Sequence, residues 1–278
     1  IFNQKAHLGN SPMKNKIIVL ILPILLLSAS CNFFTKKSNA GVVKTVNGGA
    51  DWQFANIIKD SKNTTLGAIS ISKLAFSPKN REIVFAGSYT AGLFKSEDSG
   101  GSWSKILSKI LVYDFVLHPQ DEKIIYVSGF YGGFGKILRT ADGGKTWEEI
   151  YNEQGEENPV RVIAINYQNP AQMLAGTNSG NMIKSSDGGL SWKFAYNFKE
   201  RIQKVFWNNN EIFVLTKTKG VFKAKDFAEN FENLSTKITK AFDLSDLSYN
   251  KDAIEEFNQM FVDYFDNNLI FITTNQGI

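Results

Sequence analysis

The sequence predicts an all-β protein, a β-propeller built from four-stranded antiparallel blades. Three observations carry this prediction. A short box with an acid, glycines and a tryptophan recurs along the chain, and each box follows a similar series of short apolar runs. The boxes start at residues 45, 96, 140, 185 and 224, a spacing of 39 to 51 residues that is typical of one propeller blade. The 22 glycines and an aromatic content of 13% favour a β-rich globular chain over a disordered one.

Residues 13–30 are predicted to be a signal peptide. Met13 is followed by two lysines and an apolar run, residues 17–27, that is too short to span a bilayer comfortably. Three small residues and Cys31 come next, an arrangement that resembles a bacterial lipoprotein signal, in which the cysteine becomes the lipidated first residue. Ser28 departs from that motif, which usually has leucine there. An ordinary secretory signal cleaved near the same place is therefore the alternative.

The flanks of this signal have separate interpretations. Residues 1–12 precede the start methionine, and we expect them to be an upstream extension that is not native. Cys31 is the only cysteine, so it cannot form an internal disulfide, and lipidation gives it a role. Residues 31–40 then form a short tether. We expect the mature protein in the extracytoplasmic part of a bacterial cell envelope, anchored to the membrane through Cys31.

The boxes themselves, called tryptophan boxes below, define the repeat. The strong copies are "SEDSGGSW" at 96–103, "TADGGKTW" at 140–147 and "SSDGGLSW" at 185–192. The copy "TVNGGADW" at 45–52 has asparagine in place of the acid, and a fifth, degenerate copy starts at residue 224. Their recurring residues are Asn47, Trp52, Ser96, Asp98, Gly100, Trp103, Thr140, Asp142, Gly144, Trp147, Ser185, Asp187, Gly189, Trp192 and Asp226.

Each unit that ends in a box has the pattern of four strands. In the unit around Trp103, apolar and β-branched runs at 74–76, 83–87 and 92–95 predict the first three strands. The box closes a hairpin into the fourth strand. No segment between boxes has room for a crossover helix, which argues against a parallel α/β sheet. The propeller is therefore assigned to residues 41–278.

The boxes are predicted to be architectural. An acid followed by two glycines can also form a metal or phosphate loop, but regular repetition favours a structural role. Asp142 can accept hydrogen bonds from its own turn, and Gly143 and Gly144 can adopt the positive φ of a tight hairpin. Trp147 offers a large apolar surface to bury against the sheet or the next blade. With one acid per blade, the acids are expected far apart around a ring, so we expect no catalytic residues and no metal among them.

The boxes, each preceded by a strand similar to "A-G-T", resemble the Asp-box (BNR) repeat, S/T-x-D-x-G-x-[ST]-W. That repeat occurs in bacterial sialidases, xyloglucanases, sortilin-type receptors and the photosystem II assembly-factor family. The resemblance covers residues 41–278. It implies a propeller without specifying an activity. It also implies that the boxes lie on the face opposite the ligand site.

The sequence has few of the residues that the enzymes of this fold, or common hydrolases, would need. Sialidases use an arginine triad, and of the four arginines only Arg161 and Arg201 begin first strands, so the triad is not expected. Glycoside hydrolysis otherwise needs two facing carboxylates, and xyloglucanase-like enzymes have a much longer, two-propeller chain. After processing, His118 is the only histidine, which disfavours a Ser-His-Asp triad or a histidine-rich metal site.

Charge and motifs also disfavour nucleotides and nucleic acids. The net charge is +4, but three lysines precede residue 31, and the rest of the chain has 28 basic against 27 acidic residues. Basic runs and glycine-rich phosphate loops are both missing from the sequence, so we expect no nucleic-acid partner and no cofactor. Two function classes remain open: a non-enzymatic binding or assembly module, and a carbohydrate-active or glycan-binding propeller.

The candidate contact face lies at the turns between second and third strands, because these turns are opposite the boxes. The segment "GFYGGFG" at 129–135 is predicted to be a projecting loop. Exposed aromatic side chains in loops often contact proteins or sugars. Phe130, Tyr131 and Phe134, with Tyr89 of the neighbouring blade, are the candidate contact residues for a protein or glycan. Local packing over the blade edge is the alternative role.

The C-terminal part departs from the period. After Phe231 about 20 extra, acidic residues suggest an inserted loop with a short helix near 245–257, which is either a partner-binding insertion or a solvated excursion. Residues 260–265 then fit a first strand. The segment 41–52 could complete the last blade and close a five-bladed ring. Alternatively, further blades of a six- or seven-bladed ring are missing from this sequence.

Overall fold

The computed structural model describes residues 41–59, 61, 64–208, 210–225, 227–235, 256–263 and 265–274. The signal peptide, Cys31, the tether and Asp226 lie outside the described residues. Within the described part, no helix is long and apolar enough to cross a membrane.

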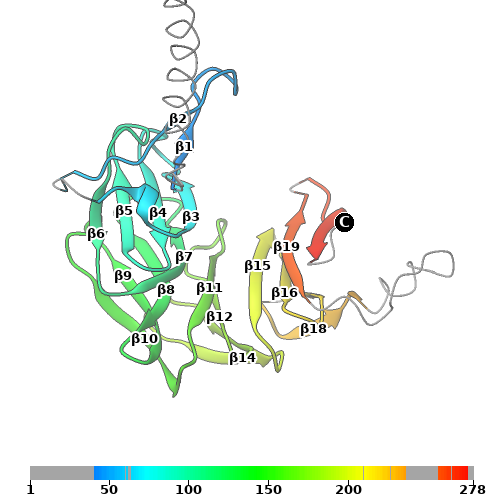
Figure 1. Ribbon diagram of the computed structural model, residues 1–278. Helices are drawn as coiled ribbons and strands as arrows, with labels where there is room; N and C mark the ends of the chain where they lie inside the picture. Colours follow the sequence, from blue (N-terminus) through cyan, green and yellow to red (C-terminus); the bar gives the residue numbers. More distant parts are fainter. Residues whose placement is uncertain are drawn as a thin grey trace, which may run out of the picture. The chain divides into compact units, whose positions relative to one another are not determined.

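Four four-stranded antiparallel sheets form the body of the fold (Figure 1). Blade 1 consists of β3 (Ile71–Phe76), β4 (Val84–Ser88), β5 (Gly92–Ser96) and β6 (Ser104–Leu107). Blade 2 consists of β7 (Leu111–Leu117), β8 (Ile125–Tyr131), β9 (Phe134–Thr140) and β10 (Glu148–Glu156). Blade 3 consists of β11 (Val160–Ile165), β12 (Met173–Thr177), β13 (Asn181–Ser185) and β14 (Lys193–Asn197). Blade 4 consists of β15 (Ile202–Asn208), β16 (Glu211–Thr216), β17 (Val221–Lys225) and β18 (Asn230–Asn233).

Two further sheets have two strands each. They are β1 (Val43–Lys44) with β2 (Gln53–Phe54), and β19 (Phe257–Val262) with β20 (Ile270–Thr274). A short 3-10 helix, Leu66–Ala68, lies between β2 and blade 1. The architecture confirms the predicted all-β propeller of four-stranded antiparallel blades.

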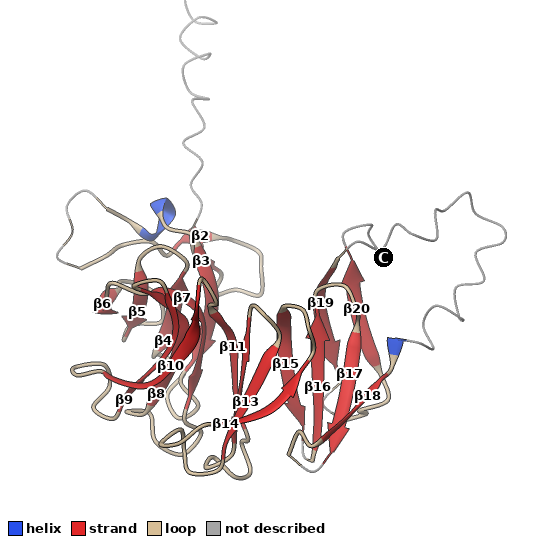
Figure 2. Cartoon of the chain, turned by 90° about the horizontal axis from the view of Figure 1, so that it is seen from below, coloured by secondary structure: helices blue, strands red, loops and turns tan. Residues whose placement is uncertain are grey.

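The blades pack face to face in chain order. Each first strand lies against the first and second strands of the preceding blade: β7 against β3 and β4, β11 against β7 and β8, β15 against β11 and β12, and β19 against β15 and β16. Figure 2 shows the same succession of sheets, with the inner strands β7, β11, β15 and β19 in sequence. The first strands are therefore the inner strands of the propeller, and the core is divided among the spaces between blades.

Those spaces are filled by side chains of the inner and second strands. Phe85 of blade 1 packs against Phe115 of blade 2, with ring centroids 6.4 Å apart, in a cluster that also contains Leu93 and Val127. Equivalent clusters join blade 2 to blade 3 and blade 3 to blade 4. Burial of apolar area contributes about 25 cal/mol per Å², so the packing of these side chains between blades stabilises the fold.

A glycine at the start of each third strand makes room for the connection to the next blade. A Cβ atom on Gly92 would lie 2.0 Å from the carbonyl oxygen of Leu107, and one on Gly180 would lie 2.5 Å from that of Glu200. Gly135 is crowded by the backbone of Asn158, and Gly220 by the side chain of Ser235. In blades 1 to 3 the recurring glycine is thus required because backbone crosses directly over it, and in blade 4 because a side chain does.

Boundaries near the C-terminus differ from the prediction. The strand expected at 260–265 is β19, Phe257–Val262, and it starts three residues earlier. Most of the expected helix near 245–257 lies outside the described residues, and Phe257, its last residue, is in a strand. The amide of Phe257 donates to the carbonyl of Lys217 at 2.8 Å, which attaches the start of β19 to blade 4. The sequence missed this start because the contact that sets it comes from another blade.

The two-stranded sheet β1–β2 packs on blade 1. The indole nitrogen of Trp103 donates to the carbonyl of Ala55, which directly follows β2, at 2.7 Å. In the described part of the chain, β1–β2 and β19–β20 are separate sheets, and the joint blade considered above is not formed.

Candidate binding face at the start of the inner strands

The two edges of the blades carry different features. In blades 1 to 4 the tryptophan box joins the third strand to the fourth, so these four boxes lie at one edge, called the box edge, whereas the copy at 45–52 joins β1 to β2. Because the strands are antiparallel, the turns between second and third strands lie at the opposite edge, together with the first residues of the inner strands. We call this second edge the mouth.

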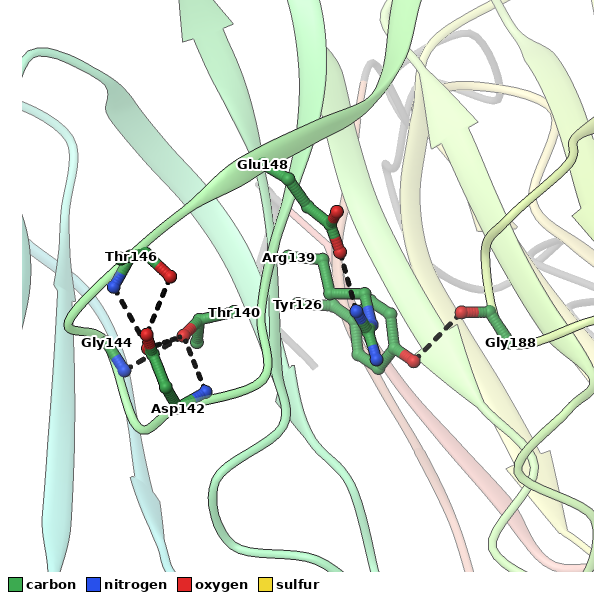
Figure 3. A network of polar contacts seen from close by, with 8 residues as sticks. All are labelled: Tyr126, Arg139, Thr140, Asp142, Gly144, Thr146, Glu148 and Gly188. Carbon is green, nitrogen blue, oxygen red and sulfur yellow. Dashed lines mark hydrogen bonds and ion pairs between the residues drawn. The ribbon is translucent and has the colours of Figure 1, made fainter.

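The box at 140–147 shows how its acid is used (Figure 3). One carboxylate oxygen of Asp142 accepts hydrogen bonds from the Thr140 hydroxyl at 2.7 Å and from the Thr146 amide at 2.9 Å, and the other accepts from the Thr146 hydroxyl at 2.6 Å. The Thr140 hydroxyl oxygen in turn accepts from the amide of Gly144 at 3.0 Å. Gly143 and Gly144 have φ of +79° and +94°, the left-handed conformation that a glycine adopts without strain.

The other boxes repeat this network. Asp98 accepts from both the amide and the hydroxyl of Ser102, and Asp187 does so from Ser191. These bonds stabilise the ionised carboxylates, and the hydroxyl donors lower the pKa most. The pKa of Asp98 and that of Asp142 lie well below the usual range, and the pKa of Asp187 falls to about 2. In the copy at 45–52, the side-chain oxygen of Asn47 takes the position of the aspartate carboxylate and accepts a hydrogen bond from the backbone amide of Asp51 at 2.9 Å.

The tryptophans of blades 1 to 3 connect each box to the part of the chain that precedes its blade. Trp103 is fully buried, and the indole of Trp147 donates to the carbonyl of Ile106, on the last strand of blade 1, at 2.9 Å. Trp192 packs edge-on against Tyr151 of blade 2, with centroids 6.2 Å apart. The predicted partner of Trp147 was the sheet or the next blade; the structure keeps the sheet, where Trp147 packs on the cluster that contains Val127, and replaces the next blade by the preceding one. Trp52 is 64% exposed.

Figure 3 shows a second tie between blades at this edge. The hydroxyl of Tyr126 in blade 2 donates to the carbonyl of Gly188 in the box of blade 3 at 2.9 Å. Beside it, Arg139 forms an ion pair with Glu148 at 2.6 Å. Among the described residues no group of three or more His, Cys, Asp or Glu side chains could hold a metal ion. The hydroxyl of Tyr126 and the carboxylate of Glu148 are thus used to join blades and strands, whereas the Nε atom of Arg139 and the indole nitrogen of Trp192 are buried without a hydrogen-bond partner among the described residues.

At the mouth, the predicted loop at 129–135 is a β-hairpin. Strand pairing continues to Tyr131 and Phe134, which are paired partners, and the turn has only two residues. Gly132 and Gly133, with φ of +63° and +87°, allow this tight turn, which is why the segment does not form the projecting loop that the sequence suggested. The hairpin is longer than its counterparts in blades 1 and 3, whose second strands end three or more residues before the third begins.

The four candidate aromatic residues are not on one surface. Tyr131 and Phe134 share the face of β8 and β9 that Val127 buries against blade 1. Phe130 points to the opposite face, because successive side chains of a strand alternate. Tyr131 is 50% exposed and Tyr89 is 39% exposed. The ring of Tyr89 packs at a tilt of 59° against the ring of Tyr113, with centroids 5.6 Å apart, and the sequence did not point to Tyr113. Contact with a partner stays a prediction for all four.

The inner strands share a feature at the mouth that sequence reasoning missed. The register of each first and second strand shifts by one residue at the same position, as in a β-bulge. The extra residues are Ser72, Tyr113, Arg161, Gln203 and Asn258. Bulges of this kind turn side chains away from the regular alternation and are frequent beside functional sites.

Four side chains, one from each of blades 1 to 4, come together there, and we call them the mouth row: Tyr89, Tyr113, Arg161 and Arg201. The guanidinium carbon of Arg161 lies 4.1 Å from the ring centroid of Tyr113. Burial lowers the pKa of Arg161, and so does the neighbouring charge of Arg201, while the two tyrosines favour its cation. The Nε atom of Arg201 is buried without a hydrogen-bond partner, and no ion pair joins either arginine to a carboxylate in the described part of the chain.

Carboxylates near the mouth are already engaged. Asp114 forms an ion pair with Lys73 at 2.6 Å and accepts from the amide of Ile163 at 3.2 Å. Glu200 accepts from the amides of Thr218 and Lys219; burial raises its pKa, but the hydroxyls of Thr216 and Thr218, followed by these amides, lower the pKa below its usual value. Both acids therefore serve as acceptors that connect strands, whereas the Nε–H of Arg201 is a buried donor without a partner among the described residues.

Comparisons with known proteins place this geometry in context. No protein-family model matches the chain. A probable oligoxyloglucan-reducing end-specific xyloglucanase of Neosartorya fischeri is 29% identical over 112 residues, 38% of this chain and 14% of the relative. A xyloglucanase of Hypocrea jecorina is 29% identical over 85 residues, 30% of this chain and 10% of the relative. The matches thus span only a small part of the relatives' own length.

Solved structures agree on the fold. YCF48 bound to D1 peptide has a TM-score of 0.52 and 16% identity, covering 74% of this chain and 63% of that one. The GH74 xyloglucanase from Xanthomonas campestris has a TM-score of 0.51 and 17% identity, covering 60% and 30%. The GH74 enzyme of Niastella koreensis has a TM-score of 0.50 and 19% identity, covering 59% and 29%. At these identities the likeness is one of fold.

Proposed function

We propose that this chain is a non-enzymatic, extracytoplasmic binding or assembly module built on an Asp-box β-propeller, and that its partner, a protein or a glycan, binds at the mouth. The observation that carries the proposal is the mouth row. It presents two tyrosine rings in contact and two arginines without carboxylate partners among the described residues. Binding sites commonly combine a rigid scaffold with a few convergent polar groups of this kind.

The box edge supports the same division of roles. Its acids are fully used by their own turns, and its tryptophans join neighbouring blades. A neighbour of similar fold, YCF48, is known with a bound peptide, so the fold is compatible with partner binding. The signal-like segment before Cys31 supports a position outside the cytoplasm and a lipid anchor.

A second candidate function is glycoside hydrolysis. The partial identity to two xyloglucanases favours it. Hydrolysis requires two carboxylates that face the scissile bond from either side, with at least one of them free to exchange a proton. Near the mouth, Asp114 is held by Lys73 and two backbone amides, and Glu200 is held by backbone amides. This engagement favours the binding module.

A position-specific crosslinking experiment tests the proposal. A photoreactive phenylalanine analogue would replace Tyr89 at the mouth or, as the matched control, exposed Lys145 at the box edge, in the full chain. We expect adducts with a defined partner from position 89 and not from position 145. Adducts from position 145 alone, or from neither position, would contradict the proposal. Release of reducing ends from xyloglucan by the purified wild-type protein would favour the enzyme instead.

A further inference from the structure

The two arginines of the mouth row lie in an unusual electrostatic situation. Arg161 is half-buried, and its guanidinium carbon lies 4.1 Å from the ring centroid of Tyr113, so its cation is held against that ring. Arg201 comes from the next blade and is close enough to disfavour the charge on Arg161. Two adjacent cations repel one another, and an anion bound between them would remove that repulsion.

The unsatisfied group strengthens this point. A buried donor without a partner costs about 1–3 kcal/mol, and buried N–H groups in folded proteins nearly always have one. The Nε–H of Arg201 is such a donor among the described residues. The guanidinium fork is geometrically suited to carboxylates, which it can bind through two parallel hydrogen bonds. A bound carboxylate would therefore satisfy the donor and neutralise the pair.

The surroundings of the row disfavour an extended peptide. Peptides that add to a propeller or sheet are bound largely through main-chain hydrogen bonds. At the mouth the corresponding backbone groups are already bonded to each other: Tyr89 N to Ser70 O at 3.0 Å, Asn178 N to Pro159 O at 2.9 Å, and Lys217 N to Arg201 O at 3.0 Å. Recognition at the row must rely on side chains.

The side chains that remain fit a charged sugar. The partly exposed ring of Tyr89, which contacts the tilted ring of Tyr113, is a flat surface with a hydroxyl at its edge. Such a surface suits a sugar ring, which has an apolar face and a rim of hydroxyls. The cations adjoin the rings at one end of the row only, so the row matches a sugar unit with a single carboxylate.

We propose that the mouth row is a binding site for a uronate unit of an acidic polysaccharide, with Arg161 and Arg201 holding its carboxylate and Tyr89 supporting its ring. This inference rests on the proposed function, because it specifies the ligand of the same face. The proposed ligand differs from xyloglucan, the neutral substrate named for the two partly similar relatives, because a uronate carries the negative charge that the two arginines require.

The test uses the full chain and trigalacturonate at pH 7, measured by isothermal titration calorimetry. Wild-type protein should bind trigalacturonate, and its fully methyl-esterified, uncharged form should bind at least about tenfold more weakly. Arg161→Gln and Arg201→Gln should each weaken binding of trigalacturonate by at least about tenfold. Arg81→Gln, which removes the same charge from an exposed turn at the box edge, should leave the affinity unchanged. Thermal unfolding would establish that each variant is folded, and Tyr89→Ala, at an exposed position, provides an independent variant should an arginine variant misfold.

Three results would overturn the inference. They are no binding of trigalacturonate by the wild type, equal binding of the methyl ester, and binding that the mouth-row substitutions leave unchanged. Tighter binding of a polyglutamate peptide than of trigalacturonate would assign the arginines to an acidic protein partner instead. Any of these results, together with crosslinking from position 89, would reject the uronate and retain the binding face, whereas loss of that crosslinking would reject the proposed function itself.

Discussion

Two tryptophans at the same position of the repeat differ almost only in burial, which allows a matched test of how the boxes stabilise the fold. Trp103 is fully buried, whereas Trp52 is 64% exposed. A buried tryptophan removes about 200 Å² from water, which at about 25 cal/mol per Å² corresponds to about 5 kcal/mol. About a third of that burial remains for Trp52, or about 2 kcal/mol. We therefore expect Trp103→Ala to lower the free energy of unfolding by about 3–5 kcal/mol and Trp52→Ala by about 2 kcal/mol or less.

The contact of the indole nitrogen adds to the difference. Trp103→Ala also leaves the carbonyl of Ala55 without its donor at 2.7 Å. Urea unfolding followed by circular dichroism would give both free energies, with a second probe used to check that the transition is two-state. Equal losses for the two variants, or a loss below about 1 kcal/mol for Trp103→Ala, would refute the argument that burial against the preceding blade is what the box tryptophan contributes.

Three further predictions concern the acid of the box, the anchor and the crowded glycine. The lowered pKa of Asp187, about 2, means that its ionised form contributes stability above the unfolded pKa near 4, and that this contribution is lost as the pH falls from about 4 towards 2; Asp187→Asn should flatten the pH dependence of the thermal midpoint in that window. Cys31→Ser should move the protein from the membrane fraction to the soluble extracytoplasmic fraction, because the substitution removes the residue that would carry the acyl chains, and stable anchoring needs more than one of them. Full retention by membranes would rule out the lipoprotein assignment. Gly92→Ala should destabilise by more than about 2 kcal/mol because its Cβ would meet the Leu107 carbonyl at 2.0 Å, whereas Gly132→Ala, with φ of +63° and open space around it, should cost only about 1 kcal/mol; thermal melts of both variants compare the two costs.

The hairpin and the inner strands mark the limit of prediction from sequence. The aromatic residues around 129–135 were recognised as unusual, but their direction depends on how far β8 and β9 remain paired. Because β8 and β9 remain paired as far as Tyr131 and Phe134, and successive side chains of a strand point to opposite faces, Phe130 lies on the face opposite Tyr131. The bulge on each inner strand leaves no clear mark in the sequence, because it is defined by the partner strand and not by the residues of the bulge alone.

The sequence by itself determined the repeat, the class of fold and the internal structure of the boxes, because each box is closed by hydrogen bonds between residues at most four positions apart, such as Asp142 with Thr146. Local contacts of this kind are readable from the residue types and their spacing. Only the tertiary structure decided which blade each tryptophan packs on and which side chains meet at the mouth. Tyr89, Tyr113, Arg161 and Arg201 come from four blades and are brought together by the stacking of whole sheets, and that stacking is driven by apolar burial, which has no directional code in any one segment.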